Sequence, residues 1–321
     1  MSEALLLGVD VGGTTIAGGL VTADGEVVCA RRAPARQDTA LPAIRAMIAT
    51  LADEARARGR PLAGVGVGVP GPVDTAAGVV SAPVPHATDL AGLPLAALLR
   101  EDAGVAVFVD NDVNALALAE WRFGAGRGAR SLVVLAPGTG FGAGVILDGR
   151  LVRGVAGYGG EFGHTPVKFD GRACWCGGRG CLAVYASGRG IADAARARAT
   201  PGSRLLAAAG GDPLAITAPF VFREAAAGDP AASAVIDEAC QALGAMIATI
   251  VNGLNPEAVI VTGGVAGAFA SLETRVRKAA AGHAFDRALA ATRVTIVPGD
   301  KRVSARGPAA LVLYEMERRE A

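Results

Sequence analysis

The chain has 321 residues, which is about two domains at the usual 100–200 residues each. Its 31 Lys and Arg nearly balance its 30 Asp and Glu, which argues against a generally basic nucleic-acid-binding protein, and 51% hydrophobic residues argue against disorder. Glycine is over-represented at 45 residues, so we expect many turns and points of close backbone approach. The only lysines are Lys168, Lys278 and Lys301, and none lies in a Walker-type loop. Phosphate binding would therefore rely on backbone amides, hydroxyls and a metal ion.

Neither a membrane nor a secretory location is indicated by the sequence. The residues around Met1 lack the positive charges of a signal peptide. The longest charge-free segment, Ala239 to Pro256, contains polar residues and is expected to be a buried helix. Five cysteines in a chain of this length do not indicate a disulfide scaffold. We therefore expect a cytoplasmic protein.

The first third of the chain reads as strands, turns and helices of an α/β domain. An apolar strand ends at an acid and runs into a glycine-rich turn, and two further strands follow around an Asp-Gly hairpin turn. A helix with apolar residues at helical spacing comes next, then two short strands and a second helix. The predicted strands are Leu5–Asp10, Ile16–Val21, Glu26–Ala30, Val65–Val69 and Val105–Val109, and the predicted helices are Pro42–Gly59 and Asn114–Phe123.

The same order of elements restarts near residue 131. A strand, a glycine-rich turn containing Thr, a strand, an Asp-Gly turn and a strand follow one another, which predicts an internal duplication of one α/β domain. A late strand leads into Gly263-Gly264, and a last helix is expected to pack on the first domain. These segments are Ser131–Leu135, Gly138–Gly142, Ala143–Leu147, Arg150–Val152, Ala258–Thr262 and Gly307–Arg319.

Three glycine turns at strand ends could hold a nucleotide, although each alone is also typical of a plain tight turn. The first supplies an acid for hydrated Mg²⁺ with amides and hydroxyls for phosphate, the second supplies another phosphate cradle, and the third lets a base or ribose approach the backbone. Together they favour a nucleotide clamp between two lobes. The residues concerned are Asp10, Gly12, Gly13, Thr14, Thr15, Gly138, Thr139, Gly140, Gly263 and Gly264.

Five segments in this order resemble the ROK family of sugar kinases and repressors, and most of all its bacterial glucokinase branch. They are Asp10–Thr15, Asn111-Asp112-Val113-Asn114, Gly138–Gly142, Glu161-Phe162-Gly163-His164 and the block Cys174 to Cys181, and the resemblance runs from about residue 5 to about residue 315.

The resemblance implies an α/β, two-lobed, actin-like (ribonuclease-H-like) ATPase fold that uses ATP with Mg²⁺. We expect a small lobe of residues 1–113, on which 304–321 packs back, and a large lobe of residues 114–303 that carries the zinc loop and part of the nucleotide site. The family's repressors carry an N-terminal helix-turn-helix, and the phosphate turn here begins only ten residues in, so no nucleic-acid partner is expected. A homodimer or higher homo-oligomer is expected only because the resemblance implies it.

A metal site is predicted by three cysteines within eight residues and a histidine ten residues earlier. Three thiolates and one imidazole suit a closed tetrahedral site for structural Zn²⁺. The ligands would be His164, Cys174, Cys176 and Cys181, whereas Cys29 and Cys240 are expected to be ordinary buried thiols. The resemblance implies that His164 also contacts the sugar, through the ring nitrogen that the metal leaves free.

Asp112 is the predicted catalytic base, because it follows a strand and precedes a helix, where open α/β sheets place functional groups. The alternative role for this segment is helix capping, and Asp110 is expected to be a structural acid. The predicted sugar-binding residues are Asn111, Asp112, Glu161 and His164.

The identity of the sugar stays open at this stage. The family usually has Glu where Ala183 stands, an Asn-Leu pair near Val84, and often Lys where Thr15 stands. We therefore predict ATP-dependent phosphorylation of the 6-hydroxyl of glucose or a glucose-like hexose. The alternatives are a kinase of an amino or N-acylamino sugar (3-amino-3-deoxyglucose, glucosamine or N-acetylmannosamine), a non-catalytic sugar-sensing protein, and polyphosphate instead of ATP as the donor.

Overall fold

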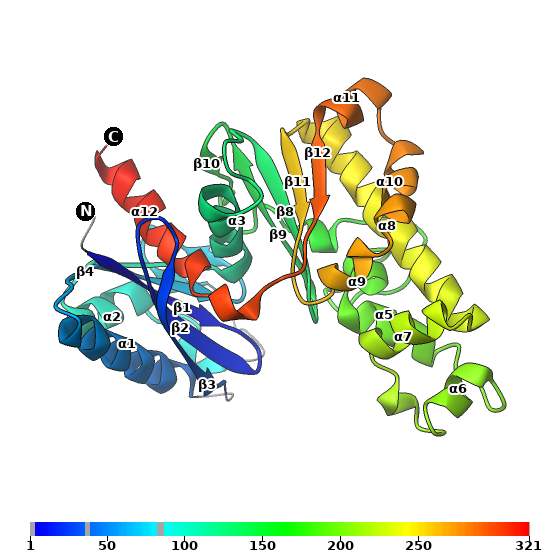
Figure 1. The fold of residues 1–321 in the computed structure, drawn as a ribbon, viewed down its shortest axis with the longest axis horizontal. Helices are drawn as coiled ribbons and strands as arrows, with labels where there is room; N and C mark the ends of the chain where they lie inside the picture. Colours follow the sequence, from blue (N-terminus) through cyan, green and yellow to red (C-terminus); the bar gives the residue numbers. More distant parts are fainter. Residues whose placement is uncertain (1–3, 36–38, 82–86, 321) are drawn as a thin grey trace. The chain divides into compact units, whose positions relative to one another are not determined.

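The computed structural model describes residues 4–35, 39–81 and 87–320. The chain divides into two compact units (Figure 1). Unit 1 comprises residues 1–129, 144–160 and 300–321, and unit 2 comprises residues 130–143 and 161–299. Unit 1 thus runs beyond residue 113 and includes the helix that follows it, and the C-terminal helix also belongs to it.

Unit 1 is built on a five-stranded sheet with the order β3-β2-β1-β4-β7. The first three strands are antiparallel neighbours, whereas β1, β4 and β7 are parallel. A two-stranded hairpin, β5-β6, follows β4. The strands are β1 (Leu5–Val11), β2 (Thr15–Val21), β3 (Val27–Pro34), β4 (Leu62–Val69), β5 (Val73–Asp74), β6 (Val79–Val80) and β7 (Val107–Asn111).

Helices cover both faces of this sheet (Figure 1). Because side chains alternate along a strand, Leu5, Leu7 and Val9 of β1 face one side, where they join the buried core with α1 and α2. The other face packs against α12, which also contacts α3. The helices of this unit are α1 (Ala40–Ala57), α2 (Leu95–Ala103), α3 (Asp112–Phe123) and α12 (Arg306–Glu320), with 3₁₀ turns η1 (Thr88–Leu90) and η4 (Lys301–Val303).

Glycines in β1 and β4 let the C-terminal segment and α12 lie directly on the sheet. A Cβ on Gly8 would fall 2.1 Å from the carbonyl oxygen of Ala305, and a Cβ on Gly66 would fall 1.8 Å from that of Pro308. No side chain fits at either position, so part of the glycine excess serves helix-on-sheet packing rather than turns.

Unit 2 holds β8, β11, β12 and the start of β9, which belong to a second sheet with the order β10-β9-β8-β11-β12. Strands β8, β11 and β12 are parallel neighbours. The strands are β8 (Leu132–Pro137), β9 (Phe141–Leu147), β10 (Arg150–Leu151), β11 (Ala258–Val261) and β12 (Arg293–Ile296).

The helices of unit 2 are mostly short, except for the long α8. They are η2 (Phe162–His164), α4 (Ala183–Ala186), α5 (Gly188–Arg196), α6 (Arg204–Ala208), η3 (Pro213–Ala215), α7 (Ala218–Ala226), α8 (Pro230–Leu254), α9 (Ala266–Ala270), α10 (Glu273–Ala281) and α11 (Asp286–Ala291). Among the described residues, α8 is the one helix whose length and hydropathy would suit a membrane span, and 67% of its most apolar segment is buried inside the fold, as expected for a core helix.

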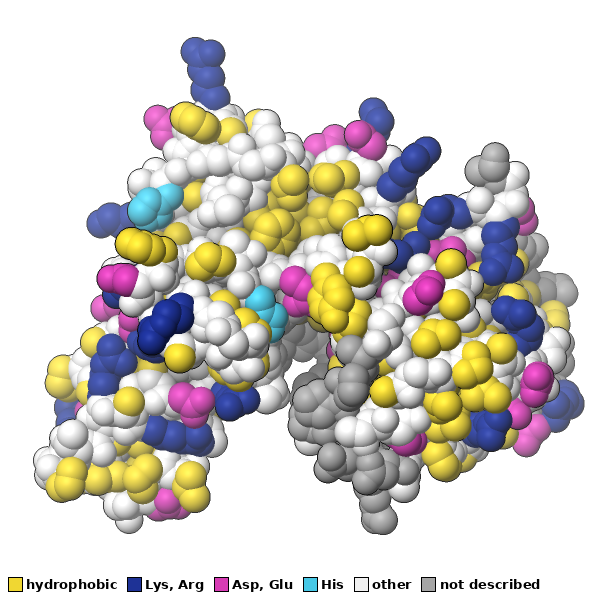
Figure 2. Space-filling model, turned by 180° about the vertical axis from the view of Figure 1, so that it is seen from behind, with side chains coloured by type: hydrophobic (Ala, Val, Ile, Leu, Met, Phe, Trp, Pro, Cys, Tyr) yellow, Lys and Arg dark blue, Asp and Glu magenta, His cyan; other side chains and the backbone are white. Residues whose placement is uncertain are grey.

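The predicted elements agree with the structure in type, with shifts of a few residues at their ends. Strand β7 ends at Asn111 rather than Val109, and α3 begins at Asp112 rather than Asn114, so a strand and a helix meet at the predicted catalytic segment. On the face shown in Figure 2, basic and acidic side chains are intermixed, in keeping with the balanced charge.

Candidate active site

The acidic residues predicted in unit 1 lie at one end of its sheet. Asp10 is level with Gly68 across β1 and β4, and Gly68 is level with Asp110 across β4 and β7. A Cβ on Gly68 would lie 3.3 Å from the Cα of Asp112, so this glycine lets the start of α3 approach the middle strand. The structure therefore brings Asp10 and Asp112 to the carboxyl ends of β1 and β7, the parallel strands on either side of β4, where such sheets bind ligands.

Asn111, rather than Asp112, caps helix α3. Its side-chain oxygen accepts hydrogen bonds from the backbone N–H of Val113 (2.9 Å) and Asn114 (3.1 Å), and its Nδ2 donates to the carbonyl of Gly71 at 3.1 Å. Asp112 is the first helical residue, where a carboxylate is favoured by the helix dipole. One amide proton of Asn111 remains for a ligand, and the Asp112 side chain is not needed as the cap.

Asp110 is the structural acid of this segment, as the sequence indicated. Its side chain is 1% exposed and accepts hydrogen bonds from the Asn111 backbone (2.7 Å) and the Asn114 side chain (3.0 Å). Arg153, which follows β10, pairs with it at 2.7 Å and also with Glu315 of α12 at 2.5 Å. This three-residue ion-pair network fixes the junction of β7 and α3. Sequence reasoning did not identify Arg153, because no local motif links it to residues so far away in the chain.

The predicted phosphate turn of unit 1 is exposed while its acid is largely enclosed. Gly13 and Thr14 are exposed at the tip of the β1–β2 turn, which the hydrogen bond from Gly12 N–H to the Thr15 carbonyl closes at 3.0 Å. Burial raises the pKa of the Asp10 carboxyl from its usual 3.8 to about 6, although a hydrogen bond with Ser304 acts in the opposite direction. A carboxylate held in this way is stabilised by a bound cation, which fits the predicted Mg²⁺ site.

We expect Asp10→Asn to stabilise the protein at pH 7.5 and to leave its stability nearly unchanged at pH 4. In the folded protein Asp10 keeps its proton up to about pH 6, whereas in the unfolded chain it ionises near 3.8. Stability is therefore lost as pH rises between these two values, by about 2–3 kcal/mol in total. An amide in place of the carboxyl removes this loss.

Urea unfolding of both proteins at several pH values, without divalent cations, measures the effect. The control is Asp53→Asn on α1, where the side chain is 71% exposed. An Asp10→Asn protein less stable than the wild type at pH 7.5 would contradict the expectation.

The two glycine turns predicted in unit 2 lie side by side. They follow β8 and β11, which are parallel neighbours, and the N–H of Val265 donates to the Pro137 carbonyl at 2.9 Å. The carbonyls of Gly138 and Thr139 accept hydrogen bonds from the first N–H groups of α5, which fixes this turn. No atom lies within 4 Å of the position that a Cβ would take on Gly140 or Gly264. The two turns thus border open space that suits phosphate and ribose.

The two predicted sugar-binding residues of unit 2, Glu161 and His164, lie on a single 3₁₀ turn. The N–H of His164 donates to the carbonyl of Glu161 at 3.0 Å. A Cβ on Gly163 would fall 1.9 Å from the carbonyl oxygen of Phe141, so only glycine lets this turn pack against the start of β9. Glu161 is exposed, and its carboxylate has no hydrogen-bond or ion-pair partner in the described parts of the chain. It can accept hydrogen bonds from two neighbouring sugar hydroxyls.

The four predicted metal ligands come together in unit 2. The ligand atoms of His164, Cys174, Cys176 and Cys181 all lie within 4.8 Å of one another. The Sγ of Cys174 is 3.6 Å from His164 Nδ1, and the Sγ atoms of Cys176 and Cys181 are 3.7 Å apart. Tetrahedral zinc with Zn–S of ~2.3 Å and Zn–N of ~2.0 Å requires about 3.5 Å between sulfur and nitrogen and about 3.8 Å between two sulfurs. The donor set and its geometry therefore fit Zn²⁺.

The position of Nδ1 leaves the other ring nitrogen of His164 unused by the cluster. Gly180 permits the tight loop, since its φ is +67° and a Cβ would fall 1.6 Å from the Lys168 carbonyl oxygen. Burial raises the pKa of the Cys181 thiol to about 12, so a cation is needed for this thiol to act as a thiolate. Zinc at Nδ1 would fix the tautomer and orientation of a ring whose Nε2 is available to a substrate hydroxyl.

An unforeseen contact links the zinc loop to the glycine turn after β8. The Trp175 ring stands edge-on to the His164 ring at 6.4 Å, and the guanidinium of Arg189 lies 4.6 Å from the Trp175 ring centre. The backbone N–H of Arg189 donates to Thr139. Sequence reasoning assigned no role to Trp175, although it lies between two predicted ligands, and did not identify Arg189, which belongs to no ligand motif.

The structure describes one of two positions at which the sequence departs from the family pattern near the sugar. Ala183 is fully buried at the start of α4. Val84 and the neighbouring His86 lie outside the described residues.

Residues 6–315 match the ROK family. The chain belongs to the ROK family. This ROK protein is 37% identical to a glucokinase of Halalkalibacterium halodurans over 274 residues, which span 83% of this chain and 82% of the relative. Among solved structures, a ROK family glucokinase from Streptomyces griseus in complex with glucose and AMPPNP is 32% identical, with a TM-score of 0.76, and the match covers 98% of this chain and 100% of that one.

A ROK family transcriptional regulator, a homologue of the E. coli Mlc protein, is also similar. It is 27% identical, with a TM-score of 0.84, and the match covers 99% of this chain and 82% of the regulator. The fold is thus the α/β actin-like ATPase fold of ROK proteins, as the sequence predicted, and it carries a Cys/His cluster that could bind zinc.

Proposed function

We propose that the protein is a sugar kinase that transfers the γ-phosphoryl group of ATP to the 6-hydroxyl of a hexose. Asp112 is the general base: it accepts the hydroxyl proton as the new O–P bond forms and the bond between the γ-phosphorus and the bridging oxygen to the β-phosphate breaks. The observation that carries the proposal is the placement of Asp10 and Asp112 at the carboxyl ends of β1 and β7, the two parallel strands on either side of β4. The similarity to glucokinases supports the same activity.

Separate roles are proposed for the metal-binding and the phosphate-binding residues. Asp10 would hold hydrated Mg²⁺, while Gly12, Gly13, Thr14 and Thr15 would donate amides and hydroxyls to phosphate. The glycine turns after β8 and β11 would contact the nucleotide through their backbone. Magnesium bound with ATP neutralises charge on the phosphates. The cluster supplies four ligands, which would leave no open position on a bound zinc ion, so zinc would act structurally.

Four side chains are proposed to bind the sugar by hydrogen bonds. Asn111 has one amide proton left, Asp112 accepts from the reacting hydroxyl, Glu161 can accept from two hydroxyls, and His164 offers Nε2. Ala183 provides no such contact. Loss of one charged hydrogen bond lowers affinity by roughly tenfold or more. We therefore propose glucose or a glucose-like hexose, bound more weakly than in relatives that have Glu here, and an amino or N-acylamino sugar as the second candidate.

A substrate screen tests the proposal. Purified protein is assayed with ATP or polyphosphate against glucose, mannose, glucosamine, N-acetylmannosamine and 3-amino-3-deoxyglucose, and kcat/KM is compared. We expect glucose or mannose with ATP to give the highest value, with a high KM for the sugar. The control is the same screen with Asp112→Asn protein. Any turnover that this variant shows measures the contribution of contaminating kinases.

Other results of the substrate screen would point to a different sugar, a different phosphoryl donor or a sensing role. A tenfold lead for an aminosugar would replace glucose by that sugar, and a lead for polyphosphate would replace ATP. Sugar binding without turnover of any sugar would favour a sensing role, which the similarity to ROK regulators makes the third candidate.

The free thiols of the zinc cluster are consistent with a cytoplasmic enzyme, and a homo-oligomer is proposed on the family resemblance alone.

A further inference from the structure

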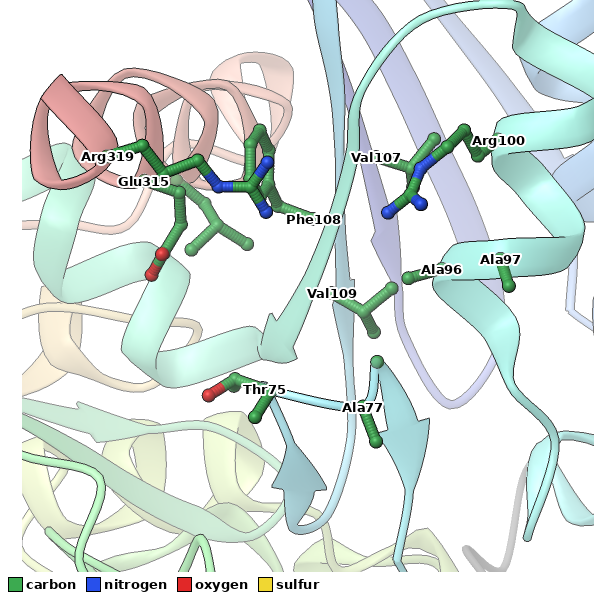
Figure 3. A pocket seen from close by; sticks show the side chains of 13 residues that line it. Thr75, Ala77, Ala96, Ala97, Arg100, Val107, Phe108, Val109, Glu315 and Arg319 are labelled. Atoms are coloured by element: carbon green, nitrogen blue, oxygen red, sulfur yellow. The ribbon is translucent and has the colours of Figure 1, made fainter.

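A cavity of about 180 Å³ lies in unit 1, away from Asp10 and its glycine turn. It is bordered by the β5–β6 turn, by α2, by α12 and by the edge strand β7 (Figure 3). Its floor includes Phe108 and Val109, and the Thr75 side chain lines one side. A strand at the edge of a sheet leaves some backbone groups without a sheet partner, so the floor offers polar as well as apolar contacts.

Two arginines from different helices line this cavity. Figure 3 shows Arg100 of α2 and Arg319 of α12 on opposite sides of β7, with both guanidinium groups directed toward it. Arg319 lies over the Phe108 ring, 4.7 Å from its centre. Neither arginine forms an ion pair or a side-chain hydrogen bond within residues 4–35, 39–81 and 87–320. The five N–H donors of each guanidinium therefore have no acceptor among the described residues.

The single acid in the cavity wall is already neutralised. Glu315 pairs with Arg153 at 2.5 Å, and Arg318 lies 3.8 Å from the same carboxylate oxygen. The amides of Ala76 and Ala77 donate to Asp74, so they are not available. The cavity is therefore positively charged, and its free donors are mainly guanidinium groups.

We propose that this cavity binds a phosphate group, either inorganic phosphate or the head of a small phosphate monoester. Two planar guanidinium groups on separate walls match a dianion with three or four oxygens better than a monocarboxylate with two. The volume agrees, since a cavity of roughly 150 Å³ holds benzene. A complete nucleotide is larger than that, so the bound species is phosphate or a monoester of a few carbon atoms.

Calorimetric titration of the full chain with inorganic phosphate tests the proposal. No ATP or sugar is present, so the result does not depend on the proposed kinase activity, and ionic strength is held constant because it screens these charges. Arg100→Gln and Arg319→Gln should each weaken the binding by about tenfold. Arg56→Gln, a control on α1 with a 77% exposed side chain, should not change it.

A variant of opposite sign gives a second readout. Glu315→Gln removes a negative charge from the wall and should tighten phosphate binding by about threefold or more. Glu317→Gln on the same helix, whose carboxylate pairs with Arg122 instead, should have no effect. Comparison of Glu315→Gln with Glu317→Gln therefore distinguishes an effect at this cavity from a general effect of the protein's net charge.

Titration with glycerol 3-phosphate then distinguishes the two sources of the phosphate group. Tighter arginine-dependent binding than inorganic phosphate would assign a monoester, and equal or weaker binding would assign free phosphate. Both outcomes support the site. Phosphate affinity that is the same in the wild type, Arg100→Gln and Arg319→Gln would overturn it, whether or not the protein phosphorylates a sugar.

Discussion

Replacing Asp112 by Asn is expected to lower kcat by a factor of about 10²–10⁴ while the protein stays folded. The carboxylate is the proposed acceptor of the hydroxyl proton, and an amide of the same shape cannot take that proton. The fold should tolerate the change, because Asn111 supplies the cap of α3. The Asp112 carboxylate also accepts a hydrogen bond from the Val113 N–H at 2.9 Å, which the amide oxygen of Asn can accept in its place, and the lost helix-dipole interaction costs about 0.3–1 kcal/mol.

Turnover with saturating sugar and ATP, together with the Tm, measures both parts of this expectation. Asp110→Asn is the matched contrast two residues earlier, since it removes one of the two carboxylates that pair with the buried Arg153 and leaves Glu315 as the other. That variant should lose about 1–3 kcal/mol of stability. A kcat for Asp112→Asn within about fivefold of the wild type would remove Asp112 from its proposed role.

Removal of the proposed zinc ion is expected to unfold the loop of residues 164–181 and to lower sugar affinity by tenfold or more. Structural zinc in small sites contributes roughly 10–16 kcal/mol at pH 7, which is comparable to the whole stability of a domain. Without the zinc ion, the three thiols and the His164 ring are no longer held together. The ring then does not hold Nε2 in a single orientation. Zinc content by mass spectrometry and glucose binding by calorimetry, before and after chelation, are the measurements.

Two variants and one fluorophore make this test specific. Cys181→Ala should lose zinc and glucose binding, whereas Cys240→Ala, which changes a buried thiol of α8 outside the cluster, should retain both. The chain has two tryptophans, and in a Trp121→Phe background the emission of Trp175 reports the ring that packs against His164. Unchanged glucose affinity and unchanged Trp175 emission in zinc-free protein would show that the metal does not organise the sugar-binding turn.

Elements and ligand motifs were predictable from the sequence because their signals are local. Short runs of apolar residues predicted β1 and β4, and the spacing of Cys174, Cys176 and Cys181 predicted the metal cluster, whose ligands the structure brings together. The choice between Asn111 and Asp112 as the cap of α3 was not predictable, because both residue types are favoured there. The hydrogen bonds at the Asn111 oxygen decide it.

Contacts between distant segments account for what the sequence did not reveal. Arg153 reaches Asp110 and Glu315 from elsewhere in the chain, and nothing near Arg153 in the sequence indicates these partners. The glycines have a similar explanation. Those at turns were expected, whereas Gly8 and Gly66 are required by a C-terminal segment that no local pattern connects to them.

The close packing of α12 on β1 and β4 has a consequence for biosynthesis. The helix begins at Arg306, so the ribosome completes β4 roughly 10–50 s before it reaches the helix at the usual 5–20 residues per second. During that interval the first sheet lacks the cover that α12 gives one of its faces, and its glycine-lined surface is accessible to other chains and to chaperones. Unit 1 therefore completes its folding only after unit 2 has been synthesised, and a chain arrested before α12 is expected to aggregate rather than to fold as an independent first domain.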